Sequence, residues 1–445
     1  MSDPWILDTI VGLNKVSLCI LKFHLIEQIQ SLFAHPKAAF VSNPLDLGME
    51  YNKDVFLKHL AQTTPHPFQI PIAKAEGVYL FEPGGKKYID LISGIGVTNI
   101  GHRHPKVVDA IKAQLDHHLH VMVYGEYIQA APNLLAQFLT TLLPPSLNCC
   151  YFVNSGTEAN EGALKLAKRA TGRTEIISFT KSYHGSTHGS LSVSGNEKKK
   201  NAFRPLLPDV RFINFNNLND LEQITTRTAC VIMETVQGDA GVRIPTLNFM
   251  KALRNKCNET GTLLILDEIQ CGMGRTGTLF AFEQFNIIPD ILTIGKAFGG
   301  GLPIGAFIAN QQVMKLLAFD PMLGHITTFG GNPVCCASAL ATLQVMQEEK
   351  IVDQVEEKGK LFEAYLVHPA IIELRRIGMF FAIDFESEEQ VQRIVTHAVE
   401  LGVICFWFLS CPNSLRIAPP LTITEEEIKI SCRLLLEAIE RSQAN

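Results

Sequence analysis

Between residues 150 and 310, short apolar stretches alternate with stretches that carry apolar residues at helical spacing. The apolar stretches are EIISFT, ACVIMETV, LLILDEI, ILTIGKA and IGAFIAN, each four to eight residues long in its apolar part, as buried strands are. Strands that alternate with helices predict βαβ units. We therefore expect an α/β fold with a mostly parallel sheet covered by helices.

The flanking regions predict a second, smaller domain. Residues 78–90 show a hairpin pattern with a turn at EPGGKKY, and the tail from residue 355 mixes helices and short strands. We expect these two regions to form one α+β lobe. The predicted division is an N-terminal extension at 1–48, the N-terminal part of the small domain at 49–105, the large domain at 106–335, and a long connecting helix with the C-terminal small domain at 336–445.

The N-terminal extension is apolar over residues 10–33, but charged residues interrupt it. Between these charged residues the longest uncharged run is residues 16–21, which is far shorter than the roughly 20 residues of a membrane span. Asp3 and Asp8 at its start are unlike the basic start of a signal peptide. Two interpretations remain: an amphipathic helix, or a start codon assigned too early, with Met49 as the true beginning.

Charge and cysteine content restrict the class of protein. Net charge is 39 − 44 = −5 without an evident basic face, so nucleic acid is not an expected partner. The eleven cysteines are scattered and contain no C-x-x-C pair, which is typical of reduced thiols in a cytoplasmic protein and not of disulfides or zinc ligands. His102 and His104 have no evident third metal ligand, so no metal site is expected.

The letters GMGRTG at 272–277 match the dinucleotide-binding fingerprint, which keeps a nicotinamide-dependent dehydrogenase open as an alternative. The fingerprint requires its first glycine at the strand end and a helix opening at its third glycine. Here four residues separate the strand from Gly272, and no helix start is evident at Gly277. These glycines are better explained by a loop that approaches another segment closely.

Three strand ends carry polar residues suited to chemistry. NSGTEAN at 154–160 opens a helix, and a helix N-terminus binds anions such as phosphate, although simple capping by Ser155 or Thr157 is the alternative. Asp267 follows four aliphatic residues, at the edge where open α/β sheets bind ligands. Lys296 lies between a strand and a glycine-rich bend, where desolvation favours Schiff-base chemistry, unless the side chain simply reaches solvent.

Together these three features match pyridoxal 5′-phosphate. That cofactor requires an anion site for its phosphate, a lysine for its aldehyde and a carboxylate for its ring nitrogen. An ionised Asp267 would keep the ring nitrogen protonated. The residues themselves therefore predict a pyridoxal-phosphate enzyme.

The same residues resemble a known family. The chain is similar to the class III pyridoxal-phosphate aminotransferases of fold type I, close to the ornithine, acetylornithine and 4-aminobutyrate members, from about residue 77 to residue 421. The resemblance lies in NSGTEANEGALKLAKRATGR, YHG, LDEIQCGMGRTG, DILTIGKAFGGGLPIGA and TTFGGNPVCCASALA. It implies a transaminase that moves an amino group from an amine or amino acid to a 2-oxo acid by a ping-pong mechanism. Since every motif follows Gly77, residues 1–48 are expected to be dispensable for cofactor binding.

The resemblance also implies roles for individual residues. Lys296 resembles the Schiff-base lysine, and Asp267 the partner of the pyridine nitrogen. Further cofactor contacts are implied for Ser155, Gly156, Thr157, Tyr183, Glu234, Gln270 and Thr328. Thr328 is expected to reach the phosphate across a subunit interface, which implies a homodimer. Arg416 resembles the receptor of a substrate α-carboxylate, Asp239 stands at a neighbouring acidic position, and Ile95 stands where an aromatic residue often lines the substrate pocket.

Two departures bear on the substrate. Ornithine- and 4-aminobutyrate-type members commonly have an arginine after HG that receives the distal carboxylate of glutamate, and this chain has Ser186. Ile95 in place of an aromatic residue favours a less polar amine or a different acceptor. An aminomutase of the glutamate-1-semialdehyde type, which uses the same lysine, is the alternative within the resemblance.

Overall fold

The computed structural model describes residues 51–443, which fall into two units divided between Pro71 and Ile72. In the first unit the described residues form one helix, α2 (Lys53–His59), whose N-terminus is capped by the side chain of Asn52. The amphipathic helix predicted within residues 1–48 lies outside the described residues.

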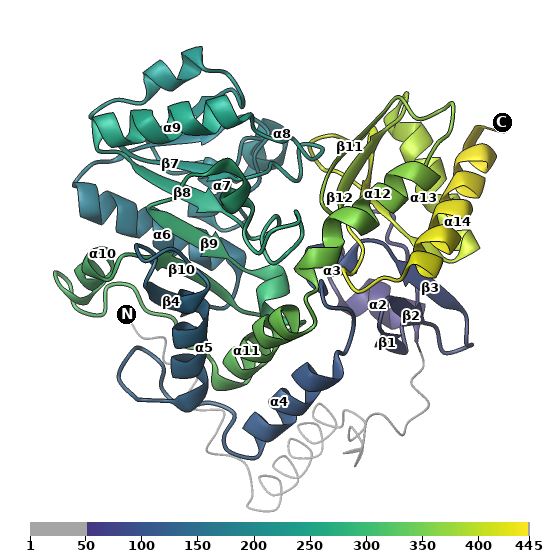
Figure 1. Cartoon of the computed structure of the whole chain (residues 1–445), viewed down its shortest axis with the longest axis horizontal. Coiled ribbons are helices and arrows are strands. Elements are labelled where there is room, and N and C mark those ends of the chain that lie inside the picture. Colours follow the sequence, from purple (N-terminus) through teal and green to yellow (C-terminus); the bar gives the residue numbers. More distant parts are fainter. Residues whose placement is uncertain (1–50, 444–445) are drawn as a thin grey trace, which may run out of the picture. The chain divides into compact units, whose positions relative to one another are not determined.

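A seven-stranded sheet is the centre of the second unit (Figure 1). Its strands, in spatial order, are β4 (Cys149–Val153), β10 (Gly305–Ala309), β9 (Ile291–Ile294), β8 (Leu263–Asp267), β7 (Thr228–Glu234), β5 (Glu175–Phe179) and β6 (Val210–Ile213). The five strands from β9 to β6 are parallel, and β10 is antiparallel to both of its neighbours. This arrangement confirms the predicted mostly parallel sheet.

Helices cover both faces of this sheet, as the continuous apolar strands require. In β7, Cys230 and Ile232 belong to the core that also contains residues of α6 (Gly156–Thr171), whereas Val231 and Met233 belong to the core that contains residues of α9 (Leu247–Thr260). Successive side chains of a strand point to opposite faces. The alternation therefore assigns even-numbered residues of β7 to the face that α6 covers.

Two four-stranded sheets carry the remaining strands. The first contains β1 (Lys74–Glu76), β2 (Tyr79–Phe81), β3 (Lys87–Asp90) and β13 (Val403–Ile404), and the second contains β11 (Glu373–Ile377), β12 (Phe380–Asp384), β15 (Ser414–Ile417) and β14 (Phe406–Trp407). The predicted hairpin is β2 and β3, which pair antiparallel, and β13 adds to β3 in parallel. The N-terminal hairpin and one strand of the C-terminal tail thus share one sheet.

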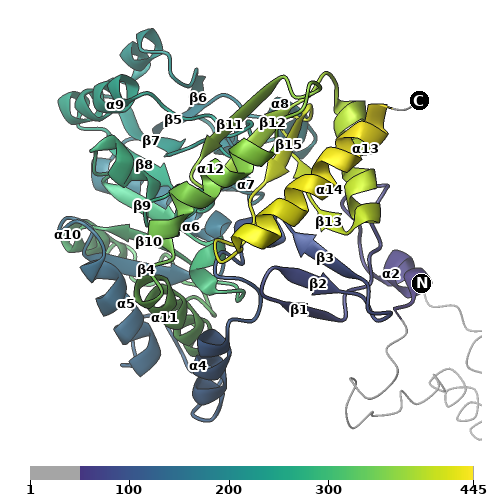
Figure 2. The same cartoon turned by 45° about the vertical axis from the view of Figure 1, so that its right-hand side comes forward.

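The other helices connect or cover these sheets. They are α3 (Ser93–Gly96), α4 (Pro105–Leu115), α5 (Ala130–Thr141), α7 (His188–Val193), α8 (Glu197–Lys200), α10 (Gln311–Met314), α11 (Pro333–Glu348), α12 (Val355–Tyr365), α13 (Glu388–Leu401) and α14 (Glu425–Gln443). Helix α11 packs on α4 and α5, whereas α14 packs on α12 and α13 (Figure 2). No helix within residues 51–443 is both long and apolar enough to cross a membrane.

Candidate active site

The carboxyl ends of three neighbouring strands bring polar side chains into one row. The register pairs Glu234 of β7 with Asp267 of β8, and Asp267 with Thr293 of β9. All three residues continue the set of side chains that faces α6, because Ile232, Ile265 and Ile291 on the same strands belong to that core. The row therefore lies between the sheet and α6.

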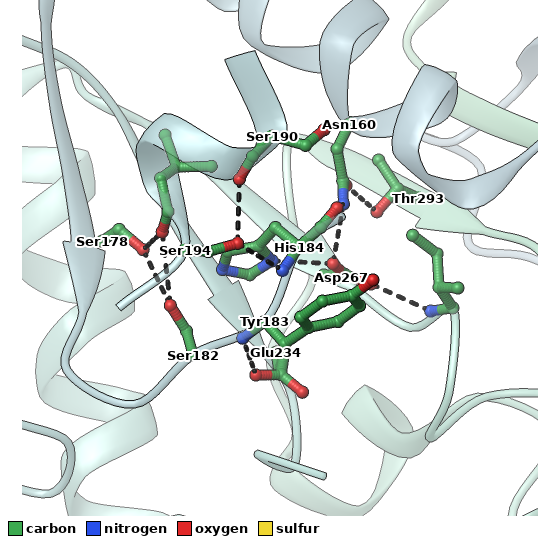
Figure 3. A network of polar contacts seen from close by, with 12 residues as sticks. Asn160, Ser178, Ser182, Tyr183, His184, Ser190, Ser194, Glu234, Asp267 and Thr293 are labelled. Carbon is green, nitrogen blue, oxygen red and sulfur yellow. Dashed lines mark hydrogen bonds and ion pairs between the residues drawn. The ribbon is translucent and has the colours of Figure 1, made fainter. Parts of the chain in front are cut away.

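A buried network holds Asp267 in this row (Figure 3). Its Oδ2 accepts a hydrogen bond from Nδ2 of Asn160 at 2.8 Å and lies 2.7 Å from Nδ1 of His184, while its Oδ1 accepts from the backbone N–H of Ile269 at 3.0 Å. Thr293 donates in turn to Oδ1 of Asn160 at 2.8 Å. The side chain of Asp267 is only 4% exposed. Its position is thus set by side chains from α6, the loop before α7 and the neighbouring strand.

Lys296 begins the short 3-10 helix Lys296–Gly299 directly after β9. Its φ of 48° lies in the left-handed region, which costs a non-glycine residue about 1–3 kcal/mol and is found mostly at functional sites. Burial lowers the pKa of its ammonium, an effect that the Asp267 carboxylate opposes. A partly desolvated amine with a lowered pKa is suited to act as a nucleophile and as a base.

Lys296, Asp267 and several other predicted residues line one cavity of about 260 Å³. The predicted residues in it are Gly156, Thr157, Tyr183, Glu234, Asp267, Gln270 and Lys296. The remaining lining residues are His184, Gly185, Ser186, Val236, Ile269 and Cys271. Chain segments far apart in the sequence therefore meet around the lysine.

The N-terminus of α6 forms one wall of the cavity. Ser155 is the N-cap and accepts a hydrogen bond from the backbone N–H of Glu158, so the capping interpretation of this residue is correct. Capping leaves other first-turn N–H groups without a partner inside the helix, and Gly156 and Thr157 line the cavity. A Cβ at Gly156 would stand 2.7 Å from side-chain atoms of Ile269, so only glycine fits there.

A carboxylate, a side-chain amide and an aromatic ring also line this cavity. Glu234 accepts hydrogen bonds from the backbone N–H groups of Tyr183 and Gly238, and burial raises its pKa to about 7. Nε2 of Gln270 is buried and has no hydrogen-bond partner among the described residues. The Tyr183 ring lines the cavity and remains 40% exposed. An unpartnered amide and an accessible aromatic ring leave groups free to contact a ligand.

Ile95 lies outside the set of residues that line this cavity. It belongs to α3, in which Ser93, Gly94, Ile95 and Gly96 all have positive φ. A β-branched residue in the left-handed region is uncommon and strained. Gly96 of this turn lies beside Gln270, so the turn adjoins the cavity through its backbone.

Asp239 and Arg416 are also outside the lining set, and they form an ion pair. Nη2 of Arg416 on β15 lies 3.0 Å from Oδ1 of Asp239, and each side chain is 6% exposed. Both charges act on the ammonium of Lys296: Arg416 helps to lower its pKa, and Asp239 opposes that effect. The pair is therefore within electrostatic reach of the lysine.

Thr328 is exposed and does not line the cavity of its own chain. Its neighbour Thr327 accepts a hydrogen bond at 2.8 Å from Asn154, which precedes α6. The segment that carries Thr328 is thus tied to the start of α6, while Thr328 itself is exposed and outside the cavity lining.

Sequence reasoning did not assign Asn160, His184 and Thr293. Asn160 lies one helical turn after Gly156, so the i,i+4 spacing places both on one face of α6. His184 stands in YHG, beside Tyr183, for which a role was predicted. Only the positions of α6 and of the loop before α7 show that Asn160 and His184 contact Asp267.

The glycine-rich stretch 272–277 forms a loop and not a dinucleotide-binding turn. Gly277 opens no α-helix, and the next element is the 3-10 helix Ala281–Phe285. Glu268 holds this 3-10 helix to the strand end, because its carboxylate accepts hydrogen bonds from the backbone N–H groups of Ala281 and Phe282. A Cβ at Gly274 would stand 2.8 Å from the end of the Met346 side chain on α11, which agrees with the interpretation of close approach to another segment.

Comparison with known proteins agrees with this geometry. The sequence profile of the aminotransferase class-III family matches residues 60–439. Acetylornithine aminotransferase of Methanopyrus kandleri is 38% identical over 380 residues, which cover 84% of this chain and 95% of that protein. The [LysW]-aminoadipate semialdehyde/glutamate semialdehyde transaminase of Sulfolobus acidocaldarius is 38% identical over 376 residues, which cover 83% of this chain and 95% of that protein.

Among solved structures, the fold is similar to that of ornithine aminotransferase from Toxoplasma gondii, whose active site holds pyridoxal phosphate at partial occupancy. The TM-score is 0.82 at 28% identity, and the match covers 88% of this chain and 94% of that one.

Proposed function

The chain belongs to the class-III aminotransferase family, and we propose that Lys296, Asp267 and the N-terminus of α6 form its pyridoxal-phosphate site. The enzyme moves an amino group from an amine or amino acid to a 2-oxo acid in two half-reactions at one site, the ping-pong scheme. Its relatives favour a donor similar to acetylornithine or ornithine, and the motifs of the sequence add 4-aminobutyrate to these candidates. The observation that carries the assignment is the single cavity shared by Lys296, Asp267 and the first turn of α6.

The residues around the cavity fit this cofactor. A phosphate requires N–H donors, which the first turn of α6 supplies at Gly156 and Thr157. A ring nitrogen requires an acid, and Asp267 is fixed there by Asn160 and His184. The buried, unpartnered Nε2 of Gln270 leaves a donor for a polar ring substituent.

When bound, pyridoxal phosphate supplies an aldehyde that takes up the amino group and a ring that withdraws electrons from the reacting carbon. Lys296 would hold the aldehyde of the cofactor, and its amine would serve as base and acid towards the donor carbon. Its lowered pKa favours the neutral amine that this step requires. Asp267 would hold the ring nitrogen in its protonated form, and Tyr183 would supply an aromatic wall of the cavity.

Substrate selection is assigned to residues around the cavity. Ser186 lines it where ornithine- and 4-aminobutyrate-type relatives commonly have an arginine, so glutamate is not expected in its usual binding mode. Arg416, Asp239 and the turn that carries Ile95 adjoin the site and are proposed to act on the substrate.

A homodimer is proposed because exposed apolar side chains lie on both sides of Thr328 in the chain, at Ile326 and Phe329. Leu119, Ile128 and Phe329 are 64%, 93% and 57% exposed, and the rings of His120 and Phe329 lie 5.0 Å apart, so the two segments adjoin. Monomeric proteins rarely expose large contiguous apolar patches. A second copy on this surface would bring Thr328 towards the partner's phosphate site.

Cytoplasmic localisation and the domain division at residues 48, 105 and 335 are also proposals. The ten cysteines between Cys149 and Cys432 are all free, which supports a reducing compartment.

The transaminase assignment is tested with a panel of amines and a 2-oxo acid. Product analysis should find the amino group on the 2-oxo acid, and borohydride reduction followed by peptide mass spectrometry should find the cofactor attached to Lys296. Migration of the amino group within one substrate, without any acceptor, would favour the aminomutase alternative. A cofactor attached to another residue would refute the site.

A further inference from the structure

Arg275, in the glycine-rich loop after β8, is buried and bonds to three other segments of the chain. It is only 1% exposed. Its Nη1 donates hydrogen bonds to the backbone oxygens of Met379 at 2.9 Å and Pro419 at 2.7 Å, and its Nη2 donates to Oδ1 of Asn99 at 2.5 Å. Met379 precedes β12, Pro419 follows β15, and Asn99 follows α3. One side chain therefore joins the loop to three segments outside the seven-stranded sheet.

The surroundings of Arg275 are unusual for a buried cation, because these hydrogen bonds end on oxygens of uncharged groups. Burial lowers its pKa to about 9, an effect that the carboxylate of Asp90 opposes. Its Nε is buried and has no hydrogen-bond partner among the described residues. Burying such a charge costs stability, and an apolar side chain of similar volume is often at least as stable. An apolar side chain does not supply the planar fork of donors, which holds several acceptors at defined angles.

Backbone hydrogen bonds join the same segments to one another. Nδ2 of Asn99 donates to the backbone oxygen of Met273 at 2.8 Å, and the backbone oxygen of Asn99 accepts from the N–H of Leu421 at 2.7 Å. The backbone oxygen of Arg275 accepts from the N–H of Met379 at 3.0 Å. The loop, the residues after α3, the start of β12 and the residues after β15 thus form one junction, and the guanidinium of Arg275 lies within it.

Three of these segments carry residues assigned to the substrate side of the site. Gln270, just before the loop, lines the cavity. Ile95 belongs to α3, where Gly96 lies beside Gln270. Arg416 belongs to β15. Lys296, in contrast, directly follows a strand of the seven-stranded sheet, and the first turn of α6 packs against the end of another. The junction therefore joins the substrate side of the site to the loop that follows β8.

We propose that Arg275 is a positioning residue for the amino donor. It holds α3 and the end of β15 at a fixed distance from the loop after β8, so that Arg416 and the turn of Ile95 form the substrate side of the site. This inference rests on the transaminase activity proposed above. Misplacement of a binding group by about 1 Å can cost about a hundredfold in reactivity. Loss of the guanidinium should therefore affect the donor much more than the cofactor.

Arg275→Met tests this role, because methionine keeps an apolar side chain and removes the fork of donors. The donors are ornithine, N-acetylornithine and 4-aminobutyrate, and the one that reacts fastest with wild type is used. Its KM should rise by about tenfold or more, while kcat stays within about threefold of wild type. The dissociation constant for pyridoxal phosphate, from absorbance titration, should equal that of wild type. Equal losses in kcat and in cofactor affinity would show general damage and overturn the positioning role.

Two further variants separate the fork from the charge and from folding. Arg275→Lys keeps the charge and loses the fork, so KM should rise here too, and a wild-type KM would refute a role for the fork. Asn99→Ala removes one acceptor and keeps Arg275, so it remains informative if Arg275→Met does not fold. Its KM should rise by about threefold or more, the effect of one lost hydrogen bond.

Arg376→Met is the matched control. Arg376 lies on β11, and its guanidinium bonds to Glu356 and Glu363 instead of to the junction. The KM for the donor and the cofactor affinity of this variant should equal those of wild type, even if its stability is lower. A rise in KM as large as that of Arg275→Met would show that the effect is not specific to the junction.

Hydrogen exchange of the cofactor-loaded protein tests the junction without turnover. The N–H of Leu421 bonds to Asn99 and the N–H of Ala418 bonds to Leu91, so both should exchange faster in Arg275→Met, while β7 exchanges as in wild type. Unchanged exchange, or faster exchange with an unchanged KM, would overturn the positioning role while the transaminase assignment stands. If no amine transfers its amino group, the proposed function fails, and exchange still decides whether Arg275 holds these segments.

Discussion

Asp267 depends on neighbours that have no direct role in amino transfer. Asn160 contacts the carboxylate with Nδ2 and is itself oriented by Thr293. A carboxylate that loses a buried hydrogen bond is less stable in its ionised form. Substitution of a residue that contacts Asp267 should therefore weaken cofactor binding, even though that residue does not itself bind the cofactor.

Asn160→Ala tests this dependence. Losing one buried hydrogen bond to a charged group costs about 1.5–3 kcal/mol, so the dissociation constant for pyridoxal phosphate should rise about tenfold or more. Thr293→Val, which removes only the hydrogen bond to Asn160, should have a smaller effect. Absorbance titration of the cofactor-free proteins measures both. Equal affinity in wild type and Asn160→Ala would show that Asn160 does not support Asp267.

The raised pKa of Glu234 predicts that the stability of the protein depends on pH. Burial raises its pKa from 4.5 to about 7 in the folded protein, so folding favours its protonated form. Its contribution to the unfolding free energy is fully present below pH 4.5 and is lost as the pH rises through 7. The loss should amount to a few kcal/mol at most, since one pKa unit corresponds to about 1.4 kcal/mol.

Urea unfolding of the cofactor-free protein between pH 4.5 and 7.5 measures this effect. The difference between wild type and Glu234→Gln should decrease over that range. The control is Glu259→Gln, at an exposed position on α9, which should show a constant difference. A constant difference for Glu234→Gln as well would mean that Glu234 is ionised throughout.

At the scale of elements, the junction of β8 with α6 places the first turn of α6 against the strand end. Gly156 opens α6 directly against Ile269, two residues beyond Asp267. The absence of a side chain at Gly156 is what allows the helix N-terminus and the carboxylate to share one cavity.

Gly156→Ala should therefore destabilise the protein. The new Cβ would stand 2.7 Å from atoms of Ile269, and overpacking of this kind costs about 1–3 kcal/mol. Adding Ile269→Ala removes those atoms, so the double variant should lose less stability than the sum of the two single variants. Gly84→Ala is the matched control, because a Cβ there meets nothing within 4 Å. Strict additivity in urea unfolding would contradict the contact.

At the scale of the whole molecule, dimerisation is predicted to complete the site through Thr328. Thr328→Ala should weaken cofactor retention by about tenfold, because one charge-assisted hydrogen bond to phosphate is lost. Mixing this variant with Lys296→Ala chains tests whether the contact crosses subunits. If it does, a hybrid dimer has one site with both defects and one with neither, and activity at limiting cofactor should return. Hybrid dimers without recovered activity would place Thr328 in its own chain's site.

The sequence by itself determined the elements and the kinds of chemical group at their ends. The five apolar stretches predicted to be strands all lie in the central sheet, as β5, β7, β8, β9 and β10. Such predictions succeed because side-chain periodicity of 2 or 3.6 residues is a local property, readable from neighbouring positions. The types of residue at Asp267 and Lys296 likewise indicated the cofactor before any contact was known.

Only the tertiary structure decided which of these groups meet. Arg416 and Asp239 are 177 positions apart, yet they pair in a buried contact, so the residue expected to receive a carboxylate already has one. His184 reaches Asp267 over 83 positions, and Asn160 over 107. Contacts at these separations depend on strand order, register and helix packing, which bring distant segments together. No local pattern contains that information, because buried polar groups find their partners only where the packed chain places them.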